Sequence, residues 1–272
     1  MNFKCLSCFL LLLIQIQFCK GITSVMNAEQ LAFGGMGTTV NNNFSAFQNP
    51  SLLVFTNGPS LGLSVENKFL TKELQSYLFQ GSVNLHLSGC IGIFGARTGN
   101  TNFSENEIGI IYSRKLTEKF SVGINFSHQE LRLNTGEYTS PNEWTAAIGM
   151  SAKPLSFLEI GVVLFNPAHF QRTNKKVNVA VPQLNIGTAW AISKNVKVRL
   201  ETEQKSPGTM ALITALEYKP NDLLCLRMGY RTSAAQPAFG FGIKMKAMKI
   251  DAGCMYHNVL GFSPGVSISY SL

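Results

Sequence analysis

The chain has 272 residues and a formal net charge of +8, but only 14% of its residues are charged. Soluble domains usually carry roughly 25% charged residues, so this composition is poor for an ordinary water-exposed surface. The basic residues are spread along the chain. This argues against nucleic acid as a partner, which would need a basic stripe, and favours contact with lipid phosphates.

The first 21 residues have the pattern of an export signal. Lys4 gives a positive start, residues 5–18 are apolar but for three polar positions, and Cys19 and Gly21 are small residues before a cleavage site. The alternative of a membrane-anchoring helix needs roughly 20 apolar residues, more than this run provides. Lipoprotein cleavage before Cys19 is disfavoured because Phe18 is bulky where a small residue is required.

The remainder of the chain has no apolar stretch long enough for a transmembrane helix. Any membrane span must therefore consist of strands, because lipid offers no partner to open backbone groups. Three cysteines remain after residue 21, namely Cys90, Cys225 and Cys254. They are odd in number and far apart, so we expect them to pack as small apolar side chains without disulfides.

Residues 60–272 alternate between apolar and small or polar side chains. Residues 120–127, for example, read Phe-Ser-Val-Gly-Ile-Asn-Phe-Ser, the period-two pattern of a half-buried strand. About fourteen such segments are predicted, most of them near the 9–11 residues that a tilted membrane strand needs. The predicted strands are residues 60–70, 76–87, 89–97, 105–115, 120–133, 142–152, 157–165, 182–192, 196–203, 209–219, 223–231, 238–246, 249–257 and 264–272.

The polar face of these strands distinguishes a barrel from a secreted β-sandwich. A sandwich would turn that face to water and should carry many Lys and Glu residues. Here it is mostly Gly, Ser, Ala, Asn and Thr, which fits a narrow lumen. The sequence therefore predicts an all-β fold, an antiparallel transmembrane β-barrel of about 14 strands in the outer membrane.

The predicted connections alternate strictly between short and long. Such barrels have short periplasmic turns and longer outer loops, so both chain ends are expected in the periplasm. The short set is around residue 88 and at residues 116–119, 153–156, 193–195, 220–222 and 247–248. The long set is residues 71–75, 98–104, 134–141, 166–181, 204–208, 232–237 and 258–263.

Residues 22–59 do not alternate and are rich in apolar side chains. Short helices are predicted over residues 26–33 and 44–48, the second ending before Pro50 because residues before proline avoid the helical region. So much apolar surface is expected to plug the lumen. The predicted organisation is a signal peptide at 1–21, a plug segment at 22–59 and the barrel at 60–272.

Two motifs in the plug segment carry a family resemblance. Residues 32–37 read Ala-Phe-Gly-Gly-Met-Gly, and residues 46–53 read Ala-Phe-Gln-Asn-Pro-Ser-Leu-Leu. A phosphate-binding loop needs a strand before the glycines and a helix after them, so a tight turn is the better interpretation. The pair resembles the N-terminal signature of the PorV/PorQ and FadL-like outer-membrane barrels, although Ser51 replaces an alanine of that signature. The residues that carry the resemblance are Gly34, Gly35, Gly37, Asn49 and Pro50.

The resemblance implies a fourteen-stranded barrel with its N-terminus inside. FadL relatives pass hydrophobic molecules such as long-chain fatty acids, whereas PorV/PorQ relatives belong to the type IX secretion system of Bacteroidetes-type bacteria. The longest predicted loop, residues 166–181, has no extended apolar stretch for ligand capture. The main hypothesis is therefore a secretion-associated or adaptor barrel of the PorV/PorQ kind. Its expected partners are outer-membrane lipid or lipopolysaccharide and other outer-membrane or secreted proteins. The alternative is FadL-like transport of small hydrophobic molecules.

Charged residues are expected on the lumen face of the later strands. Long side chains on neighbouring strands reach one another, so these residues form either an internal ion-pair network or a polar path with a ligand site. No nucleophile motif stands beside a histidine and no cluster has metal-ligand spacing, so no catalytic residue, metal or cofactor is predicted. The predicted lumen charges are Lys197, Arg199, Glu201, Glu203, Glu217, Arg227, Arg231, Lys244, Lys246 and Asp251.

Overall fold

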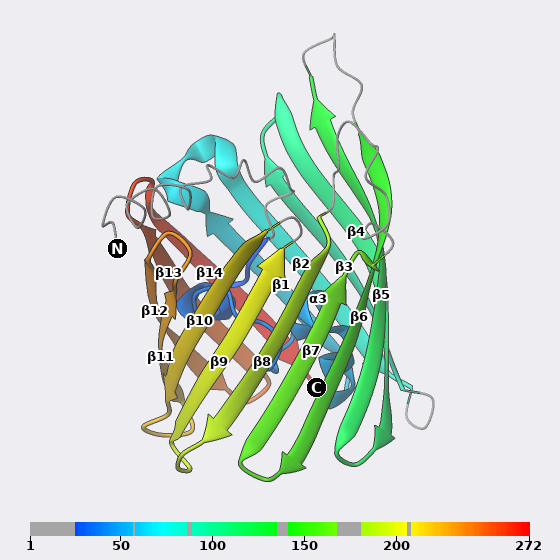
Figure 1. The fold of residues 1–272 in the computed structure, drawn as a ribbon, viewed down its shortest axis with the longest axis vertical. Helices are drawn as coiled ribbons and strands as arrows, with labels where there is room; N and C mark the ends of the chain where they lie inside the picture. The colour runs from blue at the N-terminus through cyan, green and yellow to red at the C-terminus, as the bar shows by residue number, and fades with distance from the viewer. Residues whose placement is uncertain (1–24, 57, 86–88, 135–140, 168–180, 206–207) are drawn as a thin grey trace, which may run out of the picture.

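The computed structural model describes residues 25–56, 58–85, 89–134, 141–167, 181–205 and 208–272. Over these ranges, antiparallel strands β1 to β14 form one closed barrel in which every strand pairs with its neighbours in the chain (Figure 1). The strands are β1 Ser60–Asn67, β2 Gln75–Asn84, β3 Cys90–Gly99, β4 Phe103–Thr117, β5 Phe120–Leu133, β6 Asn142–Leu155, β7 Leu158–Phe165, β8 Gln183–Ala191, β9 Val196–Lys205, β10 Thr209–Tyr218, β11 Leu224–Arg231, β12 Gln236–Met245, β13 Met248–His257 and β14 Gly261–Ser271.

The barrel closes between its first and last strands. Ser60 of β1 stands opposite Ser271 of β14 on one side and Ser82 of β2 on the other. The ladders shift register only near Thr117 and Leu155, beside two tight turns. Closure leaves no unpaired strand edge, which is the condition for spanning lipid with strands. The predicted fold class is confirmed.

Alternation decides which side chains face outward. In β1, Leu61 and Leu63 are exposed, whereas Ser60 and Ser64 are buried against the interior. The other strands repeat this arrangement, so the outer surface is a broad apolar band. Such a band would be unfavourable in water, and it is the surface that a bilayer requires. Among the described residues, no helix has the length and apolar character to cross a membrane.

The first predicted strand was three residues too long. β1 ends at Asn67 because Phe69 and Leu70 take left-handed backbone angles, with φ of 56° and 54°. They belong to the short helix η2 (Lys68–Leu70), which η3 (Lys72–Leu74) follows before β2 begins. A left-handed residue cannot continue a strand, and alternation of residue types does not report backbone handedness.

The connections define two ends of the barrel, but not by strict alternation of length. We call the end with connections 118–119, 156–157, 192–195, 219–223 and 246–247 the turn end, and the opposite end the loop end. The longest connections lie at the loop end. Two connections at that end, residues 100–102 and 258–260, are nevertheless shorter than the turn-end connections 192–195 and 219–223. Asn100 explains the first, because its side chain accepts hydrogen bonds from the backbone N–H groups of residues 102 and 103.

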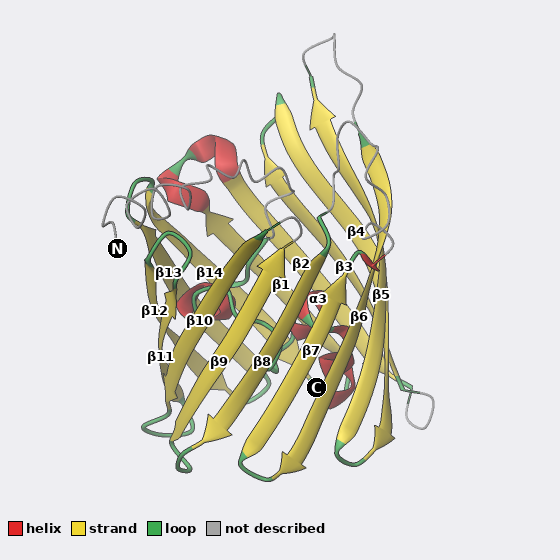
Figure 2. Cartoon of the chain, viewed as in Figure 1, coloured by secondary structure: helices red, strands yellow, loops and turns green. Residues whose placement is uncertain are grey.

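The plug segment lies inside the barrel (Figure 2). Its helices are α2 Ala28–Ala32, α3 Ser45–Gln48 and η1 Pro50–Phe55. Helix α2 packs on β12, β13 and β14, and η1 packs on β4, β5 and β6. The sequence predicted α2 and α3 within a few residues, but not η1. The predicted signal peptide at 1–21 and most of loop 166–181 lie outside the described residues.

Candidate functional site

Inward glycines form the seat on which the plug rests. At each of nine positions an added Cβ atom would lie within 3.0 Å of a plug atom. Real Cβ atoms do not approach other atoms this closely, so only glycine allows the plug backbone and side chains to contact the wall there. The nine are Gly62, Gly123, Gly149, Gly161, Gly187, Gly229, Gly240, Gly253 and Gly265. We call them the glycine seat.

The plug motif forms a compact turn against this seat. Gly34 and Gly35 take left-handed angles, with φ of 71° and 91°. A Cβ on Gly37 would lie 2.6 Å from Cβ of Gln48, so the two halves of the motif touch there. Asn49 joins them as well, since its side-chain amide donates to the carbonyl of Thr38 at 2.7 Å.

The second half of the motif begins a helix. The Oδ1 atom of Asn49 accepts hydrogen bonds from the backbone N–H and the hydroxyl of Ser51, at 3.1 and 2.7 Å. Pro50 then occupies the first turn of η1, where its missing N–H and fixed φ are tolerated. The Asn-Pro pair therefore caps η1, and the carbonyl of Ser51 accepts from the hydroxyls of Ser113 and Ser121 on the wall.

Glu201 of β9 holds the glycine turn. Its carboxylate accepts from the backbone N–H of Gly37 at 3.1 Å, and from the N–H and hydroxyl of Thr38 at 2.9 and 2.6 Å. The amide of Asn185 adds a fourth donor at 3.2 Å. Charge-assisted bonds of this kind are about twice as strong as neutral ones. Glu201 is thus a plug-holding residue.

Glu29 is the centre of the charge network. Its carboxylate contacts Arg227 at 3.0 Å and Lys249 at 2.6 Å, and it accepts from the Asn42 amide at 2.8 Å. Burial would raise the pKa of the Glu29 carboxyl, but Arg227 and Lys249 outweigh burial and hold that pKa well below its usual range. Glu29 is the only charged residue in residues 22–59. A lone charge in an otherwise uncharged plug segment could have indicated a buried ion pair, and the sequence analysis did not use it.

Two arginines of the wall face one aromatic ring of the plug. The guanidinium groups of Arg199 and Arg227 lie 5.3 and 5.5 Å from the ring centre of Phe33, within the range of cation–π attraction. Arg199 also donates to the carbonyl of Thr39 at 2.7 Å and lies 3.9 Å from Glu217. This part of the wall therefore binds the plug through charge and aromatic contacts together.

The other expected lumen charges occupy three places. Arg227 also pairs with Asp251 at 2.8 Å, beside Glu29. Arg231 pairs with Glu203 nearer the loop end, and Lys197 pairs at 3.2 Å with Glu159 of β7. The structure does not bring every predicted charge into one network. Within the described ranges, no ion pair involves the remaining two, Lys244 and Lys246 at the turn end.

The opposite side of the lumen holds an apolar cluster. There the plug residues Phe47 and Leu53 pack with Leu78, Phe94 and Ile111 of β2, β3 and β4. The rings of Phe47 and Phe94 meet edge to face with centres 5.0 Å apart. We call this contact the apolar seam. The plug thus has one charged side, toward β9–β13, and one apolar side, toward β2–β4.

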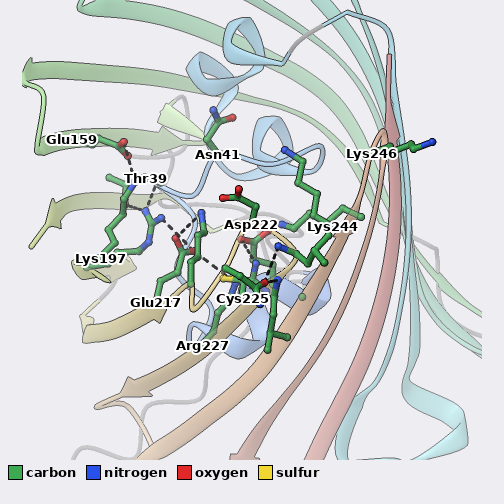
Figure 3. A pocket seen from close by; sticks show the side chains of 18 of the residues that line it. Thr39, Asn41, Glu159, Lys197, Glu217, Asp222, Cys225, Arg227, Lys244 and Lys246 are labelled. Atoms are coloured by element: carbon green, nitrogen blue, oxygen red, sulfur yellow. Dashed lines mark hydrogen bonds and ion pairs between the residues drawn. The ribbon is translucent and has the colours of Figure 1, made fainter. Parts of the chain in front are cut away.

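A cavity of about 670 Å³ opens on the turn-end side of the plug (Figure 3). Glu29 and Thr39 of the plug line it, together with charged side chains of the wall. The described residues contain no group of three His, Cys, Asp or Glu side chains arranged to hold a metal ion. As expected from their spacing, Cys90, Cys225 and Cys254 are free thiols, and the first two are buried.

Comparison with known proteins identifies the fold. No family model and no curated protein matches the chain. Among solved structures, the Ralstonia pickettii toluene transporter TbuX matches 91% of this chain and 98% of its own, with TM-score 0.66 and 11% identity. A Pseudomonas aeruginosa FadL homologue matches 93% and 100%, with TM-score 0.65 and 11% identity. The monoaromatic hydrocarbon channel CymD matches 90% and 97%, with TM-score 0.64 and 12% identity.

These likenesses define the class of protein. The chain is an outer-membrane β-barrel, as the alternating strands predicted. More particularly, it has the fold of the FadL-type fourteen-stranded barrels. At 11–12% identity the likeness concerns the fold alone.

Proposed function

We propose that this protein is a gated conduit for small hydrophobic molecules across the outer membrane. The observation that carries the proposal is the apolar seam between the plug and β2–β4. A seam of this kind inside the lumen lets an apolar molecule leave water. Burying roughly 150–250 Å² of a ring-sized molecule there would contribute about 4–6 kcal/mol.

We infer that the conduit is closed in this structure. The described strand ladders are continuous apart from shifts beside two turns, and the plug touches the wall at each position of the glycine seat. Passage therefore requires the plug to move away from the wall. The seam is the side where such movement breaks apolar packing and leaves the buried ion pairs of Glu29 in place.

The solved neighbours favour this function over a secretion-associated barrel. TbuX is a toluene transporter and CymD a monoaromatic hydrocarbon channel. Both names describe transport, and no family model matches the chain to support the PorV/PorQ resemblance of the plug motif. We accordingly place hydrophobic transport first and propose no catalytic activity. We also propose that the turn end faces the periplasm, as the shorter connections of such barrels do.

A reversible crosslink tests the conduit and its gate. The Thr56 hydroxyl donates to the Leu53 carbonyl at the end of η1 and lies near the Cys90 thiol, so Thr56→Cys places a second thiol beside Cys90 and ties the end of η1 to β3. Cys225 and Cys254 are replaced by alanine to prevent other pairings. Because toluene crosses phospholipid unaided, the vesicles carry an outer leaflet of lipopolysaccharide, which slows apolar solutes. We expect such vesicles with the oxidised variant to take up toluene slowly, and reduction to restore the uptake rate.

The control is Thr56→Ser in the same background, which oxidation should leave unchanged. If vesicles with the unmodified protein take up toluene no faster than protein-free vesicles, the proposal of a conduit is wrong. Equal uptake by the oxidised and reduced crosslinked protein would reject movement of η1 as the gate. If deletion of the gene abolishes protein secretion and vesicles with the protein take up no toluene, the secretion-associated hypothesis would be favoured instead.

A further inference from the structure

The cavity on the turn-end side of the plug has the size of a ligand site. We call it the vestibule. Its volume of about 670 Å³ falls within the roughly 300–1,000 Å³ of small-molecule pockets. The plug closes its inner side through Glu29, Thr39 and Asn41, and the barrel wall surrounds it (Figure 3). A ligand would therefore enter from the turn end.

Positive charge dominates the vestibule wall. Eight cationic side chains line it against four anionic ones, so its charge is far from balanced. The cations are Lys153, Lys197, Arg199, Lys219, Arg227, Lys244, Lys246 and Lys249, and the anions are Glu29, Glu159, Glu217 and Asp222.

Three of the lining carboxylates pair with six of the eight lining cations. Glu29 is shared by Arg227 and Lys249. Glu159 contacts Lys197 and Lys153 at 3.2 and 3.5 Å. Glu217 likewise contacts cations on each side, Lys219 at 3.3 Å and Arg199 at 3.9 Å.

Two lysines are left over at the mouth of the vestibule. Lys244 and Lys246 make no ion pair within the described ranges, and Asp222 is the single lining carboxylate there that also makes none. Both lysines are exposed at the turn end, so their side chains can move toward a ligand. In Figure 3, Lys246 points away from the cluster, so its side chain would have to turn inward to meet a ligand. The excess charge is thus available to a visiting group.

We infer that the vestibule binds a small polyvalent oxyanion, a molecule bearing phosphate or carboxylate groups. Ammonium and guanidinium groups form their strongest hydrogen bonds with such oxygens. A cleft of one charge sign between low-dielectric walls focuses the potential and raises the local concentration of the opposite ion. A soluble anion and a phospholipid headgroup present the same chemistry, and the experiment below distinguishes the two sources. This inference does not depend on hydrophobic transport.

Titration calorimetry with inorganic phosphate tests the site on the whole protein in a neutral detergent, at constant ionic strength. We expect saturable binding, and the double variant Lys244→Gln/Lys246→Gln should weaken it roughly tenfold, because each exposed charge contributes up to about fivefold. The matched control is Lys194→Gln, an exposed lysine in the turn-end connection 192–195 that does not line the vestibule. It should bind phosphate as the unmodified protein does.

Native mass spectrometry then separates the two sources. If a headgroup supplies the oxyanion, phosphatidylglycerol stays bound to the unmodified protein and is lost from the double variant. If the ligand is soluble, lipid retention is equal in both proteins while phosphate binding differs, and either result supports the site. The inference is overturned if phosphate shows no saturable binding, or if Lys194→Gln weakens it as much as the double variant. An unchanged melting temperature of the double variant excludes unfolding as the cause.

Discussion

Replacing Glu29 by glutamine tests whether the buried ion pairs hold the plug. The side chain of Glu29 is only 6% exposed, and its carboxylate contacts Arg227 and Lys249. Glutamine has nearly the same shape and still accepts the hydrogen bond from Asn42. Glu29→Gln therefore removes charge and little else.

The expected loss can be worked out from the remaining contacts. Removing one partner of a buried ion pair typically costs about 3–5 kcal/mol, because the other charge is left uncompensated. Here compensation is partial. Arg227 keeps Asp251 at 2.8 Å and Glu217 at 3.8 Å, and Lys249 keeps Asp251 at 3.3 Å. We therefore expect the free energy of unfolding to fall by about 2–3 kcal/mol, below the full range.

Denaturant unfolding in detergent micelles, followed by tryptophan fluorescence, measures this difference. The matched control is Glu130→Gln, which removes an ion pair of the same 2.8 Å length whose partner Arg132 is 64% exposed. Exposed pairs contribute about 0–1 kcal/mol, so the control should hardly change. Equal losses in the two variants would refute the conclusion that Glu29 anchors the plug.

Three further predictions concern the pH dependence of the Glu29 ion pairs, the glycine seat and the lipid-facing surface. The depressed pKa of Glu29 stabilises the folded state above the ordinary glutamate pKa, and this contribution is lost as pH falls toward the folded-state value. Denaturant unfolding at a series of pH values should therefore show the unmodified protein losing its advantage over Glu29→Gln in acid. Gly253→Ala should lower the free energy of unfolding by about 1–3 kcal/mol, since its Cβ would meet the Ala28 carbonyl. Gly95→Ala, with nothing within 4 Å of the new Cβ, should be neutral in the same assay. Ile110→Arg, in the middle of the lipid-facing side of β4, should cost about 2–4 kcal/mol when unfolding from lipid bilayers is measured.

Some of the site was readable from sequence and some was not. The motif around Gly37 and Asn49 was visible as a tight turn and a helix start, because both depend on residues a few positions apart. Its attachment to the wall was not visible, because Glu201 reaches Gly37 across 164 positions. The sequence likewise shows that Glu29 is charged. It does not show the partners of Glu29, because Arg227 and Lys249 lie on strands about 200 positions away.

The alternation of residues 60–272 by itself determined the strands, their two faces and the closed barrel, because successive side chains of a strand point to opposite sides. It did not determine how the lumen is filled. In the sequence, the inward glycines are simply small lumen residues, whereas in the structure they form the glycine seat that contacts the plug. The charged and apolar sides of the plug are likewise defined only by the strands that surround it. Strand identity is a local property of the chain, whereas the fit of a plug depends on side chains that closure alone brings together.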